Sequence, residues 1–88
     1  MTRKLQDKQL DNDRYFHSFD MGLCSALICA GFELISLDKT NPRKVQFILR
    51  REVGIEDVVD NYWADRLEVK ARTFFDNTKM LKNRIYSE

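Results

Sequence analysis

Apolar residues recur at helical spacing in the first third of the chain. Leu23 and Leu27, with the small residues between them, form one apolar stripe that ends before Gly31. Ser18 has a side chain that commonly caps a helix N-terminus, and Gly31 suits the left-handed position just beyond a helix end. The pattern therefore predicts a first helix over residues 18–30.

The pattern then changes to the alternation that is typical of strands. Residues 32–37 and 45–49 each read as a strand, and Phe47 and Leu49 would share one face of the second. The residues between the strands, beginning with 38–42, have the composition of a turn, so the strands are predicted to be antiparallel neighbours. Since an isolated two-stranded ribbon is only marginally stable, we expect the first helix to cover its apolar face.

Helical spacing returns in the C-terminal half. It predicts helices over residues 55–63 and about 71–86, and between them the alternation at 67–69 would add a short third strand. The predicted inner faces are Ile55, Val58, Val59 and Tyr62 in the first of these helices, and Phe74, Thr78, Leu81 and Ile85, supported by Phe75, in the second.

These elements predict an α+β fold in which three helices pack on a small antiparallel sheet. Their order is α-β-β-α-(β)-α, where the bracketed strand is the one at 67–69. At 88 residues the chain is long enough for one domain, which we place over residues 15–88. Residues 1–14 are polar and carry charges of mixed sign, so we expect a flexible charged arm.

Composition narrows the class of protein. A hydrophobic fraction of 43% and a charged fraction of 33% are ordinary for a soluble globular domain. No run approaches the roughly 20 apolar residues that span a bilayer, and the N-terminus lacks the pattern of a signal peptide. We therefore expect a cytoplasmic protein without membrane contact. The net charge of +1 gives no overall attraction to nucleic acid, so any such attraction must be local.

Residue types that support metal binding or nucleophilic catalysis are few. Cys24 and Cys29 lie about 140° apart around the predicted helix axis, so they cannot bond to each other and read as small buried thiols. A structural zinc site uses four Cys or His ligands, whereas His17 is the single histidine. It reads as an exposed or cap-adjacent residue beside two aromatics, although it could also serve as a base for Ser18 or a cysteine.

Carboxylates and glycines give no stronger signal for chemistry. Glu56 and Asp60 share a helix face, but they read better as a solvated acidic face than as a catalytic pair. Gly22, Gly31 and Gly54 do not form a phosphate-binding loop. Gly22 lies inside the first helix, where the missing side chain would let another element approach closely. We therefore expect no enzyme activity, no cofactor and no metal.

Two groups of residues favour binding. The first is Tyr62, Trp63 and Arg66, residue types that often anchor protein interfaces. Trp63 is one position off the inner stripe of its helix, so it would be half-exposed; alternatively, it covers the edge of the core. The second is a basic group on the hairpin and the last helix: Lys39, Arg43, Lys44, Arg50, Arg51, Lys79, Lys82 and Arg84.

The basic group has two simpler explanations that involve no partner. Positive charge on a hairpin edge prevents edge-to-edge aggregation without binding anything. The acidic residues that follow the hairpin could also neutralise it within the fold; these are Glu52, Glu56, Asp57 and Asp60.

Several short motifs between residues 18 and 86 resemble a small family of uncharacterised domains from bacteria, archaea and their phages. The motifs are Ala30-Gly31-Phe32-Glu33-Leu34, Lys44-Val45-Gln46-Phe47, Val58-Val59-Asp60-Asn61-Tyr62-Trp63, Arg72-Thr73-Phe74-Phe75 and Leu81-Lys82-Asn83-Arg84-Ile85-Tyr86. The resemblance covers about three quarters of the chain. It implies a phage or mobile-element accessory protein that acts by binding, and it assigns no activity to any residue.

Two hypotheses about function follow. The first is a non-catalytic protein-binding module, a modulator of a host or defence protein that could also self-associate as a homo-oligomer. The alternative is a small nucleic-acid-binding module that contacts phosphates with the basic hairpin and the last helix.

Overall fold

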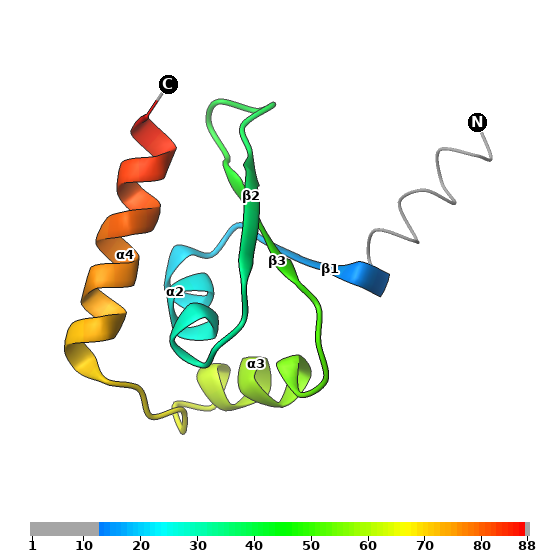
Figure 1. Cartoon of the computed structure of the whole chain (residues 1–88), viewed down its shortest axis with the longest axis vertical. Helices are drawn as coiled ribbons and strands as arrows, with labels where there is room; N and C mark the ends of the chain where they lie inside the picture. The colour runs from blue at the N-terminus through cyan, green and yellow to red at the C-terminus, as the bar shows by residue number, and fades with distance from the viewer. Residues whose placement is uncertain (1–12, 88) are drawn as a thin grey trace.

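The computed structural model describes residues 13–87, which form an α+β domain of three helices and a three-stranded antiparallel sheet (Figure 1). The predicted arm falls almost wholly on residues 1–12, which lie outside the described residues. The elements are β1 (Tyr15–Ser18), α2 (Met21–Cys29), β2 (Leu34–Asp38), β3 (Gln46–Arg50), α3 (Ile55–Trp63) and α4 (Ala71–Tyr86). The predicted fold class is confirmed, but the observed order is β-α-β-β-α-α.

The third strand of the sheet comes from the start of the domain. β3 lies at the centre, with β1 on one side and β2 on the other, and both pairs are antiparallel. Phe16 stands opposite Leu49 across the β1–β3 ladder, and Leu37 stands opposite Phe47 across the β2–β3 ladder. The prediction of a strand at 67–69 was therefore wrong, because these residues pair with no strand in the described part of the chain.

The start of the first helix was also predicted wrongly. Ser18 belongs to β1, and the helix N-cap is Asp20, whose Oδ1 accepts a hydrogen bond from the Leu23 amide at 2.8 Å. The Ser18 hydroxyl instead accepts from the Asp20 amide at 3.0 Å. Both side chains can cap a helix, but only Asp20 stands three residues before the amide that needs an acceptor. His17 accordingly lies half-buried within β1, not exposed beside a cap.

The end of α2 follows the prediction. Gly31 has a φ of 105°, and its amide donates to the Ile28 carbonyl at 3.0 Å. The Phe32 amide donates to the Leu27 carbonyl, also at 3.0 Å, which completes a Schellman motif. The chain then enters β2, and β2 and β3 form the predicted hairpin with a register irregularity between Leu34 and Ser36.

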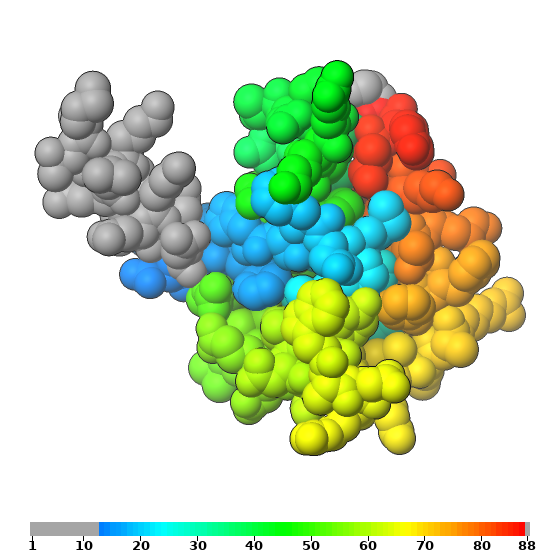
Figure 2. Space-filling view, turned by 180° about the vertical axis from the view of Figure 1, so that it is seen from behind, coloured from blue at the N-terminus to red at the C-terminus, as the bar shows by residue number. Residues whose placement is uncertain are grey.

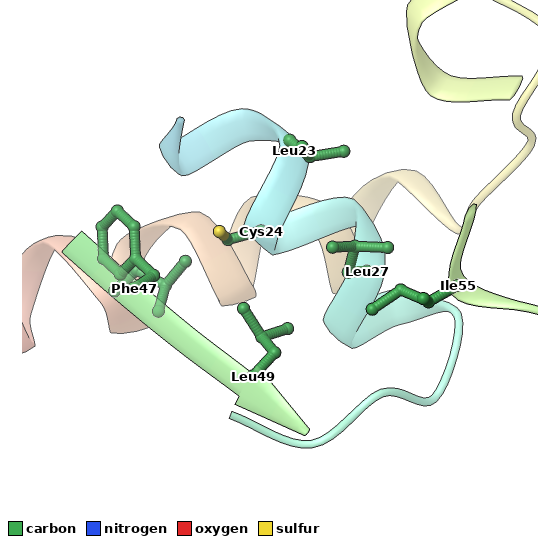
Figure 3. Packing of buried hydrophobic residues seen from close by; sticks show 7 residues of the cluster. Leu23, Cys24, Leu27, Phe47, Leu49 and Ile55 are labelled. Carbon is green, nitrogen blue, oxygen red and sulfur yellow. The ribbon is translucent and has the colours of Figure 1, made fainter. Parts of the chain in front are cut away.

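The hydrophobic core forms around α2, which contacts β1, β3, α3 and α4. Figure 3 shows side chains of α2 directed toward Phe47 and Leu49 on the central strand. The buried cluster consists of Leu23, Cys24 and Leu27 from α2, Phe47 and Leu49 from β3, Ile55 from α3 and Leu81 from α4. The expectation that the first helix covers the hairpin is therefore confirmed.

α4 packs along α2 through a polar contact as well as through Leu81. The Thr78 hydroxyl donates to the buried Ser25 hydroxyl at 3.0 Å, and Ser25 donates to the Met21 carbonyl at 2.9 Å. Phe75 was predicted to support this inner face, but it is 60% exposed. It lies one residue past the inward stripe of α4, where the Lys79 ammonium sits 5.6 Å from its ring centroid. No helix within residues 13–87 is long and apolar enough to cross a membrane.

Candidate protein-binding site

Trp63 is the last residue of α3, and its side chain is 61% exposed. Ile55 is buried on the inner face of the same helix, with Val58 and Val59 packed against the core, so the half-exposure predicted for Trp63 is confirmed. The helix ends in a turn in which Asp65 has a φ of 59°. The structure therefore displays a large aromatic side chain where the chain leaves α3.

Tyr62 holds Trp63 in place from the core side. The two rings meet edge to face, with centroids 5.0 Å apart and an interplanar angle of 81°. The Tyr62 hydroxyl lies only 2.5 Å from the position that a Cβ on Gly22 would occupy. The predicted close approach at Gly22 is thus confirmed, and the approaching group is Tyr62. Burial raises the pKa of the Tyr62 hydroxyl, and the negative charge of Asp20 raises it further.

A cavity of about 410 Å³ opens beside this aromatic pair. We call it the Trp63 groove; its lining residues are Ala26, Tyr62, Trp63, Asp65, Leu67, Val69 and Phe74. They come from α2, α3, α4 and the linker 64–70, and Figure 2 shows the yellow linker residues near the cyan of α2 and the gold start of α4. Most of the lining side chains are apolar, so the groove suits an apolar side chain of a ligand.

A second cavity of about 400 Å³ shares part of this lining. We call it the Thr73 hollow; its lining residues are Cys29, Ala30, Leu67, Glu68, Val69, Lys70 and Thr73. Leu67 and Val69 line both cavities, so the linker forms one wall of each cavity.

The structure brings together only part of the predicted aromatic–basic cluster. Tyr62 and Trp63 both line the groove, whereas Arg66 is exposed and outside its lining. The Arg66 backbone anchors the turn instead, because its amide and that of Leu67 both donate to the Asn61 carbonyl, at 2.9 and 3.2 Å. Sequence reasoning missed Leu67 and Val69 as site residues, although their alternation was visible and was read as a strand.

The predicted basic group separates into two ends of the molecule. Lys39, Arg43 and Lys44 surround the hairpin loop, which Figure 1 places near the C-terminus of α4. The Lys39 ammonium donates to the Ser87 carbonyl at 2.7 Å, and Lys39 and Arg84 line one groove of about 300 Å³ between β2 and α4. Lys44 lies over the Phe19 ring, 4.7 Å from its centroid.

A negative charge stands among these basic residues. Asp38 Oδ1 accepts from the Thr40 hydroxyl at 2.6 Å and from the Thr40 amide at 2.9 Å. The hydroxyl hydrogen bond and then the amide hydrogen bond lower the pKa of Asp38, so its carboxylate stays charged. The loop end is therefore basic overall but not uniformly so.

The other arginines lie at the opposite end of β3 and have acidic partners. Arg50 Nε lies 3.2 Å from Glu33 Oε1. Arg51 forms an ion pair with Glu56 in the first turn of α3, and its guanidinium stands 5.6 Å from the Phe16 ring centroid. The acidic helix thus neutralises Arg51, whereas Arg50 is neutralised by a residue that the sequence did not indicate. On α4, Lys79 lies over Phe75 and Lys82 is exposed.

The candidate chemical groups do not converge. Within residues 13–87 no group of three or more His, Cys, Asp or Glu side chains could hold a metal ion. Burial raises the pKa of Cys24 to about 11, against a smaller lowering by the Ser18 hydroxyl, so the thiol is neutral at pH 7. His17 Nδ1 lies 3.4 Å from Gln46 Oε1, and its Nε2 is buried without a hydrogen-bond partner in the described part of the chain. Cys29 Sγ accepts from Asn77 Nδ2 at 3.3 Å.

Comparison with protein-family models matched residues 13–87 to DUF5659, a domain of unknown function. The chain belongs to the DUF5659 family. The resemblance to a small uncharacterised family is therefore confirmed, and every motif that carried it lies within the matched range of this DUF5659 domain. No curated protein and no solved structure matched the chain.

Proposed function

We propose that this DUF5659 domain is a non-catalytic protein-binding module whose binding site is the Trp63 groove. The observation that carries the proposal is a 61% exposed tryptophan, held in place by Tyr62, at the rim of a mostly apolar cavity. Tryptophan and tyrosine side chains that become buried in a pocket on binding typically contribute most of the binding energy of an interface. A phage or mobile-element accessory role, acting in the cytoplasm on a host or defence protein, is part of this proposal.

The exposed part of Trp63 is large enough to matter for affinity. A fully buried aromatic side chain removes 150–250 Å² from water, so the exposed fraction corresponds to roughly 100–150 Å². At about 25 cal/mol per Å² its burial would contribute about 3 kcal/mol. Because Tyr62 already restricts the indole, little side-chain entropy is lost on binding.

Affinity capture with matched aromatic variants tests the proposal. The tagged chain, Trp63→Ala and Phe75→Ala are each used on the same cell lysate, since Phe75 is about as exposed as Trp63 but lies outside the groove. We expect a defined set of proteins with the original chain and with Phe75→Ala, and at least tenfold less of that set with Trp63→Ala. Equal capture by all three would contradict the proposed site. Sedimentation of the purified chain tests self-association, and a strict monomer that captures no protein would overturn the proposal.

The second candidate function is nucleic-acid binding at the loop end of the molecule. It is favoured by one observation: Lys39 and Arg84 line a single groove, and the hairpin loop that begins at Lys39 also carries Arg43 and Lys44. The paired Arg50 and Arg51 are not part of this candidate surface. Filter binding to DNA and RNA should weaken steeply with salt, because phosphate contacts release counterions. An absence of binding at low salt would end this alternative.

A further inference from the structure

The linker between α3 and α4 has the pattern of a strand, although it has no partner strand among residues 13–87. Exposure alternates along it, since Arg66, Glu68 and Lys70 are exposed while Leu67 and Val69 are half-buried. This alternation is the period of extended backbone, and Lys70 has an extended conformation with φ −69° and ψ 123°. The amides of Glu68, Val69 and Lys70 donate no hydrogen bond to any described residue. Among residues 13–87, these three amides therefore have no acceptor.

We propose that an extended peptide segment of the partner protein binds along residues 67–70 by β-strand addition. The proposal rests on the proposed function and specifies how the Trp63 groove recognises its ligand. In this mode main-chain hydrogen bonds supply affinity, and pockets for alternate side chains supply specificity. The amides on one edge of the linker would provide the first, and the Trp63 groove walled by Leu67 and Val69 would provide the second.

The side chains of the linker indicate the chemistry of the peptide. Its inward positions would be apolar, because an inward side chain would enter the Trp63 groove, whose lining is mostly apolar. The outward side chains of the linker alternate as Arg66, Glu68 and Lys70. Opposite charges on neighbouring strands stabilise a pair, and like charges destabilise it. The complementary peptide therefore carries an acidic, a basic and an acidic residue in turn, with apolar residues between them.

The outer edge of β2 is a weaker site for such a peptide. β1 and β2 each pair with β3 on one side. The groove beside β2 is lined by Lys39, Arg84 and two serines, with Leu37 as the one apolar lining residue. It lacks an apolar pocket that would hold an inward side chain, whereas the linker lies beside the mostly apolar Trp63 groove.

Selection from a random dodecapeptide display library, with the full chain as target, tests the proposal. We expect enriched peptides with apolar residues at alternate positions and acidic and basic residues between them. One enriched peptide is then synthesised in two N-methylated forms that block alternate sets of its amides. One form should lose at least tenfold in affinity and the other should bind normally, because only one set of amides faces the linker. The protein is unchanged in this comparison, so its folding is not in question.

Amide hydrogen exchange of the protein gives the second readout. On peptide binding, at least one amide among Glu68, Val69 and Lys70 should exchange about tenfold more slowly, which corresponds to an added hydrogen bond of about 1.4 kcal/mol. A peptide could need Trp63 for binding, leave these amides unprotected and bind equally well in both methylated forms. That result would overturn strand addition but not the Trp63 groove as the binding site. Protection that persists with Trp63→Ala would instead support strand addition and contradict the proposed anchor. A selection that enriches no peptide overturns the inference, and lysate capture then decides the proposed function alone.

Discussion

Replacing Gly22 with alanine should destabilise the domain, although alanine is the better helix former. Glycine inside a helix costs about 1 kcal/mol relative to alanine, so propensity alone predicts a gain of that size. The added methyl group would meet the Tyr62 hydroxyl at 2.5 Å and Asp20 Oδ1 at 3.3 Å. Overpacking of this kind costs about 1–3 kcal/mol. The net effect of Gly22→Ala is therefore a loss of about 0–2 kcal/mol.

The sign should reverse when the tyrosine hydroxyl is absent. The next nearest Tyr62 atom, Cζ, stands 3.7 Å from the new methyl group, which is ordinary van der Waals contact. In a Tyr62→Phe background, Gly22→Ala should therefore stabilise the domain by up to about 1 kcal/mol, since the propensity term then dominates. The contact at Asp20 remains in both backgrounds and does not affect the comparison.

A double-mutant cycle measures this coupling directly. Urea unfolding of the original chain, each single variant and the double variant should give an interaction energy of about 1–3 kcal/mol between positions 22 and 62. Fluorescence of Trp63, the single tryptophan, should also change in Gly22→Ala because its ring packs against Tyr62. Additive effects, or a Gly22→Ala variant about 1 kcal/mol more stable than the original, would refute the close approach and the rigid support of Trp63 that depends on it.

Three further predictions concern the cap, the ion pair and the buried thiol. Asp20→Ala should cost about 1 kcal/mol of unfolding free energy and Ser18→Ala less; a larger loss at Ser18 in urea unfolding would restore Ser18 as the cap. Glu56→Gln should cost at most about 1 kcal/mol, and 1 M NaCl should remove the difference; a loss that salt leaves unchanged would exclude an ionic origin. Burial raises the pKa of Cys24 from 9.0 to about 11. The contribution of this thiol to the free energy of unfolding is therefore complete below pH 9 and falls as pH rises to about 11. Subtracting the pH dependence of Cys24→Ala from that of the original chain should show this fall, and parallel curves would contradict it.

Elements with a strong local period could be predicted from the sequence. The helices 55–63 and 71–86 carry apolar stripes over several turns, and the structure places α3 and α4 at those bounds. The hairpin was equally clear, because a turn separates two alternating runs. β1 has four residues, and its pairing partner lies about thirty residues away, so no local pattern identifies it.

Residues 67–69 carry the alternation of a strand but have no partner strand within the described range 13–87. Alternation of apolar and polar residues indicates which side chains are buried. An extended linker that lies over a core has the same alternation as a strand in a sheet. Strand formation also needs a neighbour with free hydrogen-bonding groups, which a single sequence does not specify.

The candidate site was predictable only at its helical end. The spacing of α3 indicated that Trp63 stands off the buried stripe, which the structure confirms. The groove itself needs Ala26, Val69 and Phe74 to converge from α2, the linker and α4. That convergence depends on how the helices pack and not on any periodicity. Likewise, the separation of Arg50 from Lys39 follows from the length of β3 and its loop, not from the count of charges.

The central position of β3 sets where a shortened form of this protein can begin. A chain cut at Ser18, where the helical pattern starts, would lose Phe16 and leave one side of β3 without its ladder. The exposed backbone of Leu49 and its neighbours would then become a template for pairing between molecules, with aggregation as the outcome. A minimal folding unit therefore has to include Tyr15, and tags or fusions at the N-terminus need to join before it.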